Sequence, residues 1–208
     1  MRKNNERKKI VLLGMSYARQ WRLHIPNHIE FLNKGVEGDI TDRMVERFDS
    51  DVLQQKPDYV IIWGFSNDIT TGIRSHIEDT LRNIQKNFTV MVDMAMRQDI
   101  VPILATQITI SYRKNLWEWC LIPMGRILRK KSYTDFTNHH IKRMNDWLRE
   151  YARRQDLPLL DLEPILTNRW GFRKWRFTQQ DGSHVSEAGY QKLEKFTLTL
   201  LRDLKITK

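Results

Sequence analysis

The sequence predicts a three-layer α/β/α sandwich around a mostly parallel sheet, and two patterns along its 208 residues lead to this prediction. Short apolar runs typical of buried strands alternate with longer stretches in which apolar residues recur every three or four positions, as on one face of a helix. Strands that alternate with helices need right-handed crossovers, which leave the sheet parallel and covered on both faces. We therefore expect functional side chains at the carboxyl ends of the strands.

Strands are expected where a short apolar run lies between charged or turn residues. The runs that meet this description are residues 10–14, 59–63, 100–105 and 158–162. Helices are expected where the apolar period is three to four. The longest such stripe comprises Ile73, Ile77, Leu81, Ile84, Phe88 and Met91, and shorter stripes cover residues 45–52, 141–151 and 193–204.

The chain is short enough for one domain, which we expect to span residues 1–208. Its single cysteine, Cys120, excludes an internal disulfide framework. The basic N-terminus precedes an apolar run, residues 10–13, that is too short for the core of a signal peptide, so a cytoplasmic location is expected. No apolar run approaches the roughly 18 residues of a membrane span, although peripheral contact with a membrane stays open.

The chain carries 35 Lys and Arg against 25 Asp and Glu, a net charge of +10. This excess favours anionic partners such as phospholipid headgroups or acidic glycans, and equally fits a solvated surface. The usual nucleic-acid-binding motifs are missing, so no nucleic acid is expected as a partner. Pro26 separates His24 from His28, and His139 and His140 point apart on a helix, so neither a metal nor a cofactor is expected.

Two segments near the N-terminus contain residues that could take part in catalysis or ligand binding. Gly14 and Met15 precede Ser16 directly after the first predicted strand, where a glycine permits a tight turn that presents the hydroxyl at the sheet edge. The same serine could instead cap a helix. Further on, Gly35 and Gly38 could let backbone N–H groups approach a ligand, or could form an ordinary turn.

Two later segments add polar side chains. Asn67 follows the strand at residues 59–63 and places a side-chain amide at the same sheet edge as Ser16, although it could equally turn the chain. Asp181 and His184 are three residues apart before the last helix, so the carboxylate can hold the imidazole in one tautomer. An Asp-Gly turn beside a surface histidine is the alternative.

Together these segments resemble, in order and placement, the sequence blocks of the SGNH (GDSL-like) hydrolase superfamily over nearly the whole chain. Its four namesake residues would be Ser16, Gly38, Asn67 and His184. The resemblance implies a flavodoxin-like sheet and a serine esterase or acylhydrolase, with Ser16 as the nucleophile, His184 as the base and Asp181 as its partner. It assigns the oxyanion hole to the backbone N–H groups of Ser16 and Gly38 and to the Asn67 side chain.

The chain departs from the family pattern in two ways. Met15 stands where the family usually has Asp, which affects the geometry of the serine loop. The interval between Ser16 and Gly38 is short, which reduces the part of the pocket wall built from it.

Two segments could contact the substrate, a small-molecule, glycan or lipid ester. Arg173, Lys174 and Arg176 lie among aromatic residues and could bind an anionic or sugar-bearing ester, unless these aromatics simply cover the core. An insertion at about residues 110–133 carries Trp117 and Trp119 and could form a lid, an acyl groove or an interfacial anchor. Core packing or a dimer contact would explain the same residues.

Two other functions fit the same residues. An acyltransferase would use the same triad with a sugar hydroxyl in place of water. A catalytically degenerate binding protein would keep the fold but would not turn over a substrate. Only Met15 favours this alternative.

Overall fold

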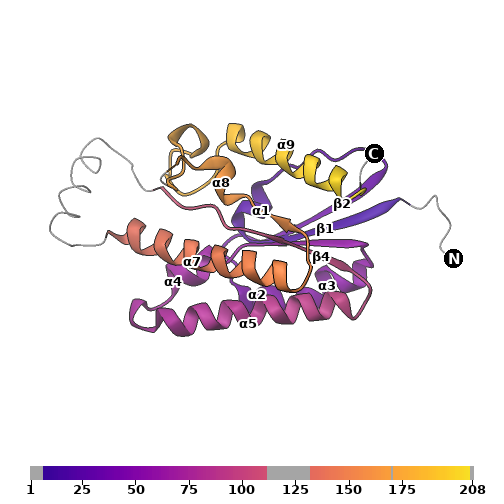
Figure 1. Ribbon diagram of the computed structural model, residues 1–208, viewed down its shortest axis with the longest axis horizontal. Helices are drawn as coiled ribbons and strands as arrows, with labels where there is room; N and C mark the ends of the chain where they lie inside the picture. The colour runs from indigo at the N-terminus through magenta and orange to yellow at the C-terminus, as the bar shows by residue number, and fades with distance from the viewer. Residues whose placement is uncertain (1–6, 112–131, 170, 207–208) are drawn as a thin grey trace.

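The centre of the molecule is a five-stranded parallel sheet in the order β2-β1-β3-β4-β5. The computed structural model describes residues 7–111, 132–169 and 171–206. The strands are β1 (Lys8–Gly14), β2 (Ile29–Gly35), β3 (Tyr59–Trp63), β4 (Val101–Ala105) and β5 (Leu159–Leu160). Helices cover both faces of this sheet, which confirms the predicted three-layer architecture (Figure 1).

The helices form two layers. One layer contains α2 (Thr41–Glu46), α3 (Phe48–Asp51), α5 (Ile77–Met96) and α7 (Tyr133–Arg154), and the other contains α1 (Ser16–Gln20), α8 (Glu163–Leu166) and α9 (Glu187–Asp203) (Figure 1). Short connecting elements are η1 (Leu53–Gln55), α4 (Ser66–Thr71), η2 (Arg74–His76) and η3 (Trp175–Phe177).

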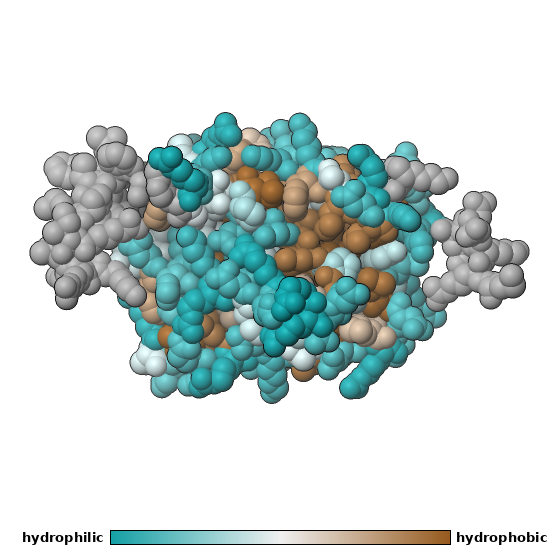
Figure 2. Space-filling model, in the orientation of Figure 1, coloured by the Kyte–Doolittle hydropathy of each residue, from teal (hydrophilic) through white to brown (hydrophobic). Residues whose placement is uncertain are grey.

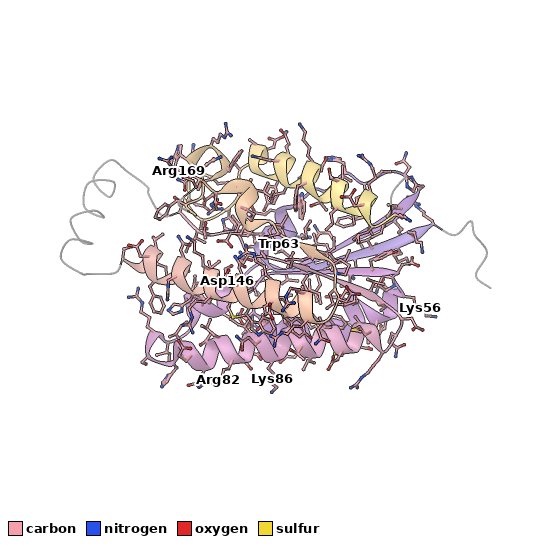
Figure 3. All side chains as sticks on the ribbon, in the orientation of Figure 1. Lys56, Trp63, Arg82, Lys86, Asp146 and Arg169 are labelled. Carbon is pink, nitrogen blue, oxygen red and sulfur yellow. The ribbon has the colours of Figure 1, made fainter. Side chains whose placement is uncertain are left out.

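Each layer has its own apolar core because successive strand residues point to opposite faces of the sheet. Val11 and Leu13 of β1 pack against the α5 layer, whereas Ile10 and Leu12 pack against the α9 layer, and all of them are fully buried. Trp63, at the end of β3, lies between the helical layers, while Arg82 and Lys86 project outward from α5 (Figure 3). A strand buried on both faces reads as a continuous apolar run, which is why these strands could be predicted.

The structure also corrects the expected elements. Strand β2 was not predicted because it lies at the sheet edge, pairs only with β1 and has mostly half-exposed side chains. The long apolar stripe forms a helix only from Ile77 onward, since Ile73 is 66% exposed and precedes η2. The stripe at residues 45–52 forms two short helices, α2 and α3, separated at Arg47.

The surface is mostly hydrophilic on the face drawn in Figure 2, and hydrophobic residues on that face gather between α9 and the end of α7. Within the described part of the chain, no helix is long and apolar enough to cross a bilayer.

Candidate active site

A pocket of about 290 Å³ lies at the carboxyl edge of the sheet. It brings together four of the predicted site residues from four separate segments, namely Ser16, Gly38, Asn67 and His184. Asp181 contacts the ring of His184. The order of strands therefore assembles residues that are up to 168 positions apart in the sequence, between Ser16 and His184.

Ser16 is presented by a tight turn between β1 and α1. A Cβ atom on Gly14 would lie 2.3 Å from the carbonyl oxygen of Trp63, so only glycine fits where β1 ends. Met15 is 2% exposed and packs into the core against Gly64. An apolar anchor thus stands where the family usually has an acidic residue, and the turn that presents Ser16 is formed nonetheless.

The loop that carries Gly38 is tied to the serine turn by Arg47, a residue that the sequence analysis missed. Arg47 Nε donates to Asp39 Oδ2 at 2.8 Å, and Arg47 Nη2 donates to the Gly14 carbonyl oxygen at 3.0 Å. Asp39 is 1% exposed, so this ion pair is largely shielded from water. Gly38 itself has a φ of 67° with open space around it, so its left-handed backbone, and not crowding, requires glycine.

Asn33 makes a second link between the same segments. Its Nδ2 donates to the carbonyl oxygens of Ala18 and Trp21 at 2.7 and 3.0 Å, and its Oδ1 accepts from the Gly35 N–H at 2.9 Å. The end of α1 is thereby held against β2. The glycine-rich segment and the serine turn consequently form one hydrogen-bonded unit.

Asn67 lies in the first turn of α4 and faces the pocket. One N–H of its side-chain amide donates to the Asp39 carbonyl oxygen at 2.8 Å. A primary amide has two N–H donors, so the second remains available for a ligand. The orientation of Asn67 is therefore set by the loop that carries Gly38.

The next residue, Asp68, joins α4 to α2. Its carboxylate accepts from the backbone N–H of Thr41 at 3.1 Å and from the Thr41 hydroxyl at 2.6 Å. Burial raises the pKa of Asp68 to about 6, against the opposing effect of these hydrogen bonds. Asp68 is thus a buried structural contact beneath Asn67.

Asp181 and His184 form a compact pair on the turn before α9. The Asp181 carboxylate contacts His184 Nδ1 and also accepts from the backbone N–H groups of Ser183 and His184 at 2.9 and 3.0 Å. Burial opposes ionisation of Asp181, but these hydrogen bonds outweigh it and lower its pKa below the ordinary value. With Nδ1 engaged, Nε2 is the ring nitrogen left for another partner.

No hydrogen bond joins Ser16 to His184 within the described residues, although both line the same pocket. Hydrogen bonds of this kind often tighten only when a substrate binds.

Two side chains hold the turn that carries His184. The Tyr17 hydroxyl donates to the Ser183 carbonyl oxygen at 2.6 Å, and Arg173 Nη2 donates to the carbonyl oxygens of Ser183 and Gly182 at 2.5 and 3.3 Å. Tyr17 directly follows Ser16, and Ser183 directly precedes His184. The hydroxyl of Tyr17 consequently connects the two chain segments that carry the serine and the histidine.

The residues expected to contact substrate are separated by the structure. Arg173 is 4% exposed and lies behind the turn of His184, not in the lining of the pocket. Arg176 is exposed and lies over the ring of Phe177, and Lys174 is half-buried outside the pocket. Trp117 and Trp119 lie outside the described residues, as does most of the expected insertion.

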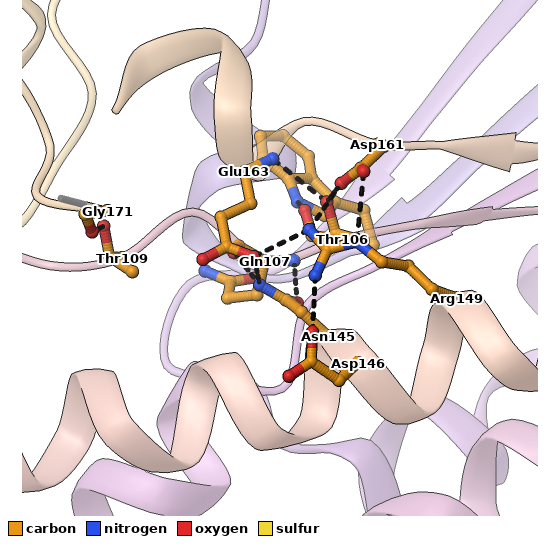
Figure 4. A network of polar contacts seen from close by, with 10 residues as sticks. Thr106, Gln107, Thr109, Asn145, Asp146, Arg149, Asp161, Glu163 and Gly171 are labelled. Carbon is orange, nitrogen blue, oxygen red and sulfur yellow. Dashed lines mark hydrogen bonds and ion pairs between the residues drawn. The ribbon is translucent and has the colours of Figure 1, made fainter. Parts of the chain in front are cut away.

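A polar network that the sequence analysis also missed joins the segment just after β4 to α7 and α8 (Figure 4). Asn145 of α7 exchanges hydrogen bonds with the backbone of Gln107 at 2.7 and 2.8 Å and donates to the Glu163 carboxylate at 2.8 Å. Arg149 pairs with the same carboxylate at 2.8 Å. Gln107 Nε2 donates to the Ser66 hydroxyl at 3.3 Å, which links the network to the pocket wall.

Among the described residues, no group of three or more His, Cys, Asp or Glu side chains is arranged to hold a metal ion.

A parallel sheet that brings a serine, a histidine and amide donors into one pocket at its carboxyl edge is an arrangement known from α/β hydrolytic enzymes. The chain belongs to the GDSL-like Lipase/Acylhydrolase family, whose model matches residues 13–192.

The chain is also similar to individual proteins of known sequence or structure. The chain is 26% identical over 137 residues to the uncharacterized lipoprotein YqeF of Bacillus subtilis (strain 168), an alignment that covers 64% of this chain and 55% of YqeF. The chain thus spans about half the length of that relative. Among solved structures, it is similar to a G-D-S-L family lipolytic protein from Desulfitobacterium hafniense DCB-2, with a TM-score of 0.69, 22% identity and coverage of 93% and 99% of the two chains. It is also similar to a GDSL-like lipase from Bacteroides thetaiotaomicron VPI-5482, with a TM-score of 0.71, 20% identity and coverage of 95% and 89%.

Proposed function

We propose that the protein is a serine esterase in which Ser16 forms an acyl-enzyme with the help of His184 and Asp181. The observation that supports this proposal is the single pocket that gathers Ser16, Gly38, Asn67 and His184, with Asp181 contacting the histidine ring from behind. A serine hydroxyl is a weak nucleophile at neutral pH and needs an adjacent base, which in turn needs an orienting partner. These residues meet those requirements.

In the proposed mechanism, His184 Nε2 accepts the proton of Ser16 as its Oγ attacks the ester carbonyl carbon. The carbonyl oxygen becomes an oxyanion, and the ester bond breaks as the imidazolium returns its proton to the leaving alcohol. Water then attacks the acyl-enzyme by the same route, which releases a carboxylic acid and restores the serine hydroxyl. Ionised Asp181 keeps the imidazole in the productive tautomer and stabilises its charged form.

The oxyanion requires donors that are in place before the reaction. We assign this role to the backbone N–H groups of Ser16 and Gly38 and to the second N–H of the Asn67 amide. The hydrogen bond from Asn67 to Asp39 and the ion pair between Asp39 and Arg47 support the assignment, because they fix the amide relative to the serine turn.

A short acyl group is the best match to the pocket. Its volume of about 290 Å³ is just below the roughly 300–1,000 Å³ range of small-molecule sites. Among the described residues, Ile110 and Tyr17 are the only large apolar side chains that line it, and the rest of the lining is small or polar. We therefore propose an ester of a short carboxylic acid as the substrate.

The proposal is tested with p-nitrophenyl esters from acetate to palmitate and with a fluorophosphonate that labels reactive serines. We expect the highest kcat/KM with the shortest esters, and a mass increase on the peptide that contains Ser16. Labelling of a different serine, or labelling of none, would refute the proposed nucleophile. A preference for palmitate would refute the short acyl group alone.

Replacement of Asn67 by Ala should lower kcat about 100-fold to 1,000-fold, the usual effect of losing one oxyanion donor, with little change in KM. The measurement is steady-state hydrolysis of p-nitrophenyl acetate. The matched control is Asn83→Ala, because the Asn83 amide donates at 2.9 Å to the Asp42 carboxylate away from the pocket. An unchanged kcat in Asn67→Ala would remove this side chain from the mechanism.

A further inference from the structure

A second pocket, of about 620 Å³, lies beside the first. Two observations place the pockets next to each other. His184 lines the first pocket, and the next residue, Val185, lines the second. Gln20 lines the second pocket and donates at 3.4 Å to Glu37, which lines the first.

The position of this second pocket indicates which portion of a bound ester, the acyl group or the alcohol, it would face. In acyl transfer the histidine returns its proton to the leaving oxygen, so the alcohol portion of an ester lies on the histidine side of the serine. The second pocket adjoins that side, because the backbone N–H of Gln179, another of its lining residues, donates to the His184 carbonyl oxygen at 2.9 Å. The pocket is therefore placed for the alcohol and not for the acyl group.

The side chains of the pocket indicate which alcohols it suits. Among the described residues, its polar lining consists of Gln20, Gln179, Gln191, Arg22, His24, Glu187 and Glu194. Primary amides and carboxylates supply several donors and acceptors, which match the closely spaced hydroxyls of a polyol. Glu187 and Glu194 stand against Arg22 and His24, and His24 Nδ1 lies 3.2 Å from the Glu194 carboxylate, so the described lining has no excess of positive groups to favour an anionic ligand, despite the net positive charge of the chain.

Apolar surface is also present in this pocket. Tyr190 lines it and stacks on Trp21 with ring centroids 6.3 Å apart, while the Tyr190 hydroxyl donates to the Tyr17 carbonyl oxygen at 2.9 Å. The ring is thus held in one orientation and gives the pocket a fixed apolar part, whereas Val185 lies fully buried at the base of the lining. A sugar ring presents hydroxyls at its edge and C–H groups on its face, and this lining offers a counterpart to each.

We propose that this second pocket binds the alcohol portion of the substrate, and that this portion is a neutral carbohydrate. The inference rests on the proposed esterase function, because it uses the direction of proton return from His184. It replaces the expectation of an anionic substrate with a neutral, hydroxyl-rich one.

The first test compares hydrolysis of acetylated cellotriose and acetylated maltotriose with hydrolysis of p-nitrophenyl acetate. Gln191→Trp places a large ring in the second pocket. We expect it to lower the kcat/KM ratio of the trisaccharide esters to p-nitrophenyl acetate about tenfold or more, the effect of losing one or two hydrogen bonds. Thr199→Trp is the control, since Thr199 is exposed on α9 about 12 Å further along the helix and should keep the ratio. An equal ratio in wild type and Gln191→Trp would overturn the inference.

The second test separates failure of this inference from failure of the proposed function. Cellotriose, maltotriose and glycerol 3-phosphate are titrated into the protein, and binding is followed by calorimetry without any turnover. Binding of either trisaccharide that is lost in Gln191→Trp supports the inference. Binding of glycerol 3-phosphate alone, or of no probe, overturns it. Absence of label on Ser16 would instead refute the proposed mechanism, and the titration would still decide whether the pocket binds carbohydrate.

Discussion

Ser16→Ala is expected to lower kcat for p-nitrophenyl acetate about a millionfold, the loss typical when the nucleophile of such a triad is removed. Without the hydroxyl, no acyl-enzyme can form, and His184 has no group to activate. The fold should survive, because Ser16 begins a short helix without acting as its cap and makes no side-chain hydrogen bond within the described residues. The measurement is the rapid release of p-nitrophenol on mixing, together with the thermal midpoint Tm.

The control for this variant is Ser50→Ala, which removes an exposed hydroxyl outside the pocket that donates to the Arg47 carbonyl oxygen at 3.1 Å. It should retain full activity. Activity of Ser16→Ala within tenfold of wild type would show that another group attacks the ester.

Asp181→Asn is expected to lower kcat about 10,000-fold, because an amide cannot hold the imidazole in the tautomer that accepts the serine proton. The effect should lie in kcat and leave KM nearly unchanged, since Asp181 is not part of the pocket lining. The matched control is Asp203→Asn, which removes the same charge from an exposed position at the end of α9. Equal loss in both variants would mean that charge alone, and not this carboxylate, is responsible.

The same variant should alter the dependence of stability on pH. The pKa of Asp181 in the folded protein lies below its ordinary value, so its contribution to stability is present above that value and is lost as pH falls through the folded pKa. Urea midpoints measured from neutral pH down to pH about 3 should therefore fall more in wild type than in Asp181→Asn. An equal fall would show that the contacts of Asp181 with His184 and Ser183 do not contribute to stability.

The residues of the candidate site that come just after a strand could be predicted from the sequence. Gly14, Gly38 and Gly64 all sit where the backbone has a positive φ or where a Cβ atom would collide, and Ser16 and Asn67 come within three residues of two of them. This local chemistry, together with the carboxyl-end rule for parallel sheets, was enough to propose the pocket. The role of Met15 was not predictable, because only its contact with Gly64 shows that it anchors the serine turn.

The sequence by itself determined the three-layer class, the central strands and the residues of the candidate triad, because apolar period and turn chemistry are properties of neighbouring residues. The tertiary structure alone decided that β2 is an edge strand, that Arg173 supports the turn of His184, and that a second pocket adjoins the first. These features depend on contacts between distant segments, such as the hydrogen bond between Tyr17 and Ser183, which are 166 positions apart. Such a contact leaves no local pattern in the sequence, because its two partners become neighbours only in the folded chain.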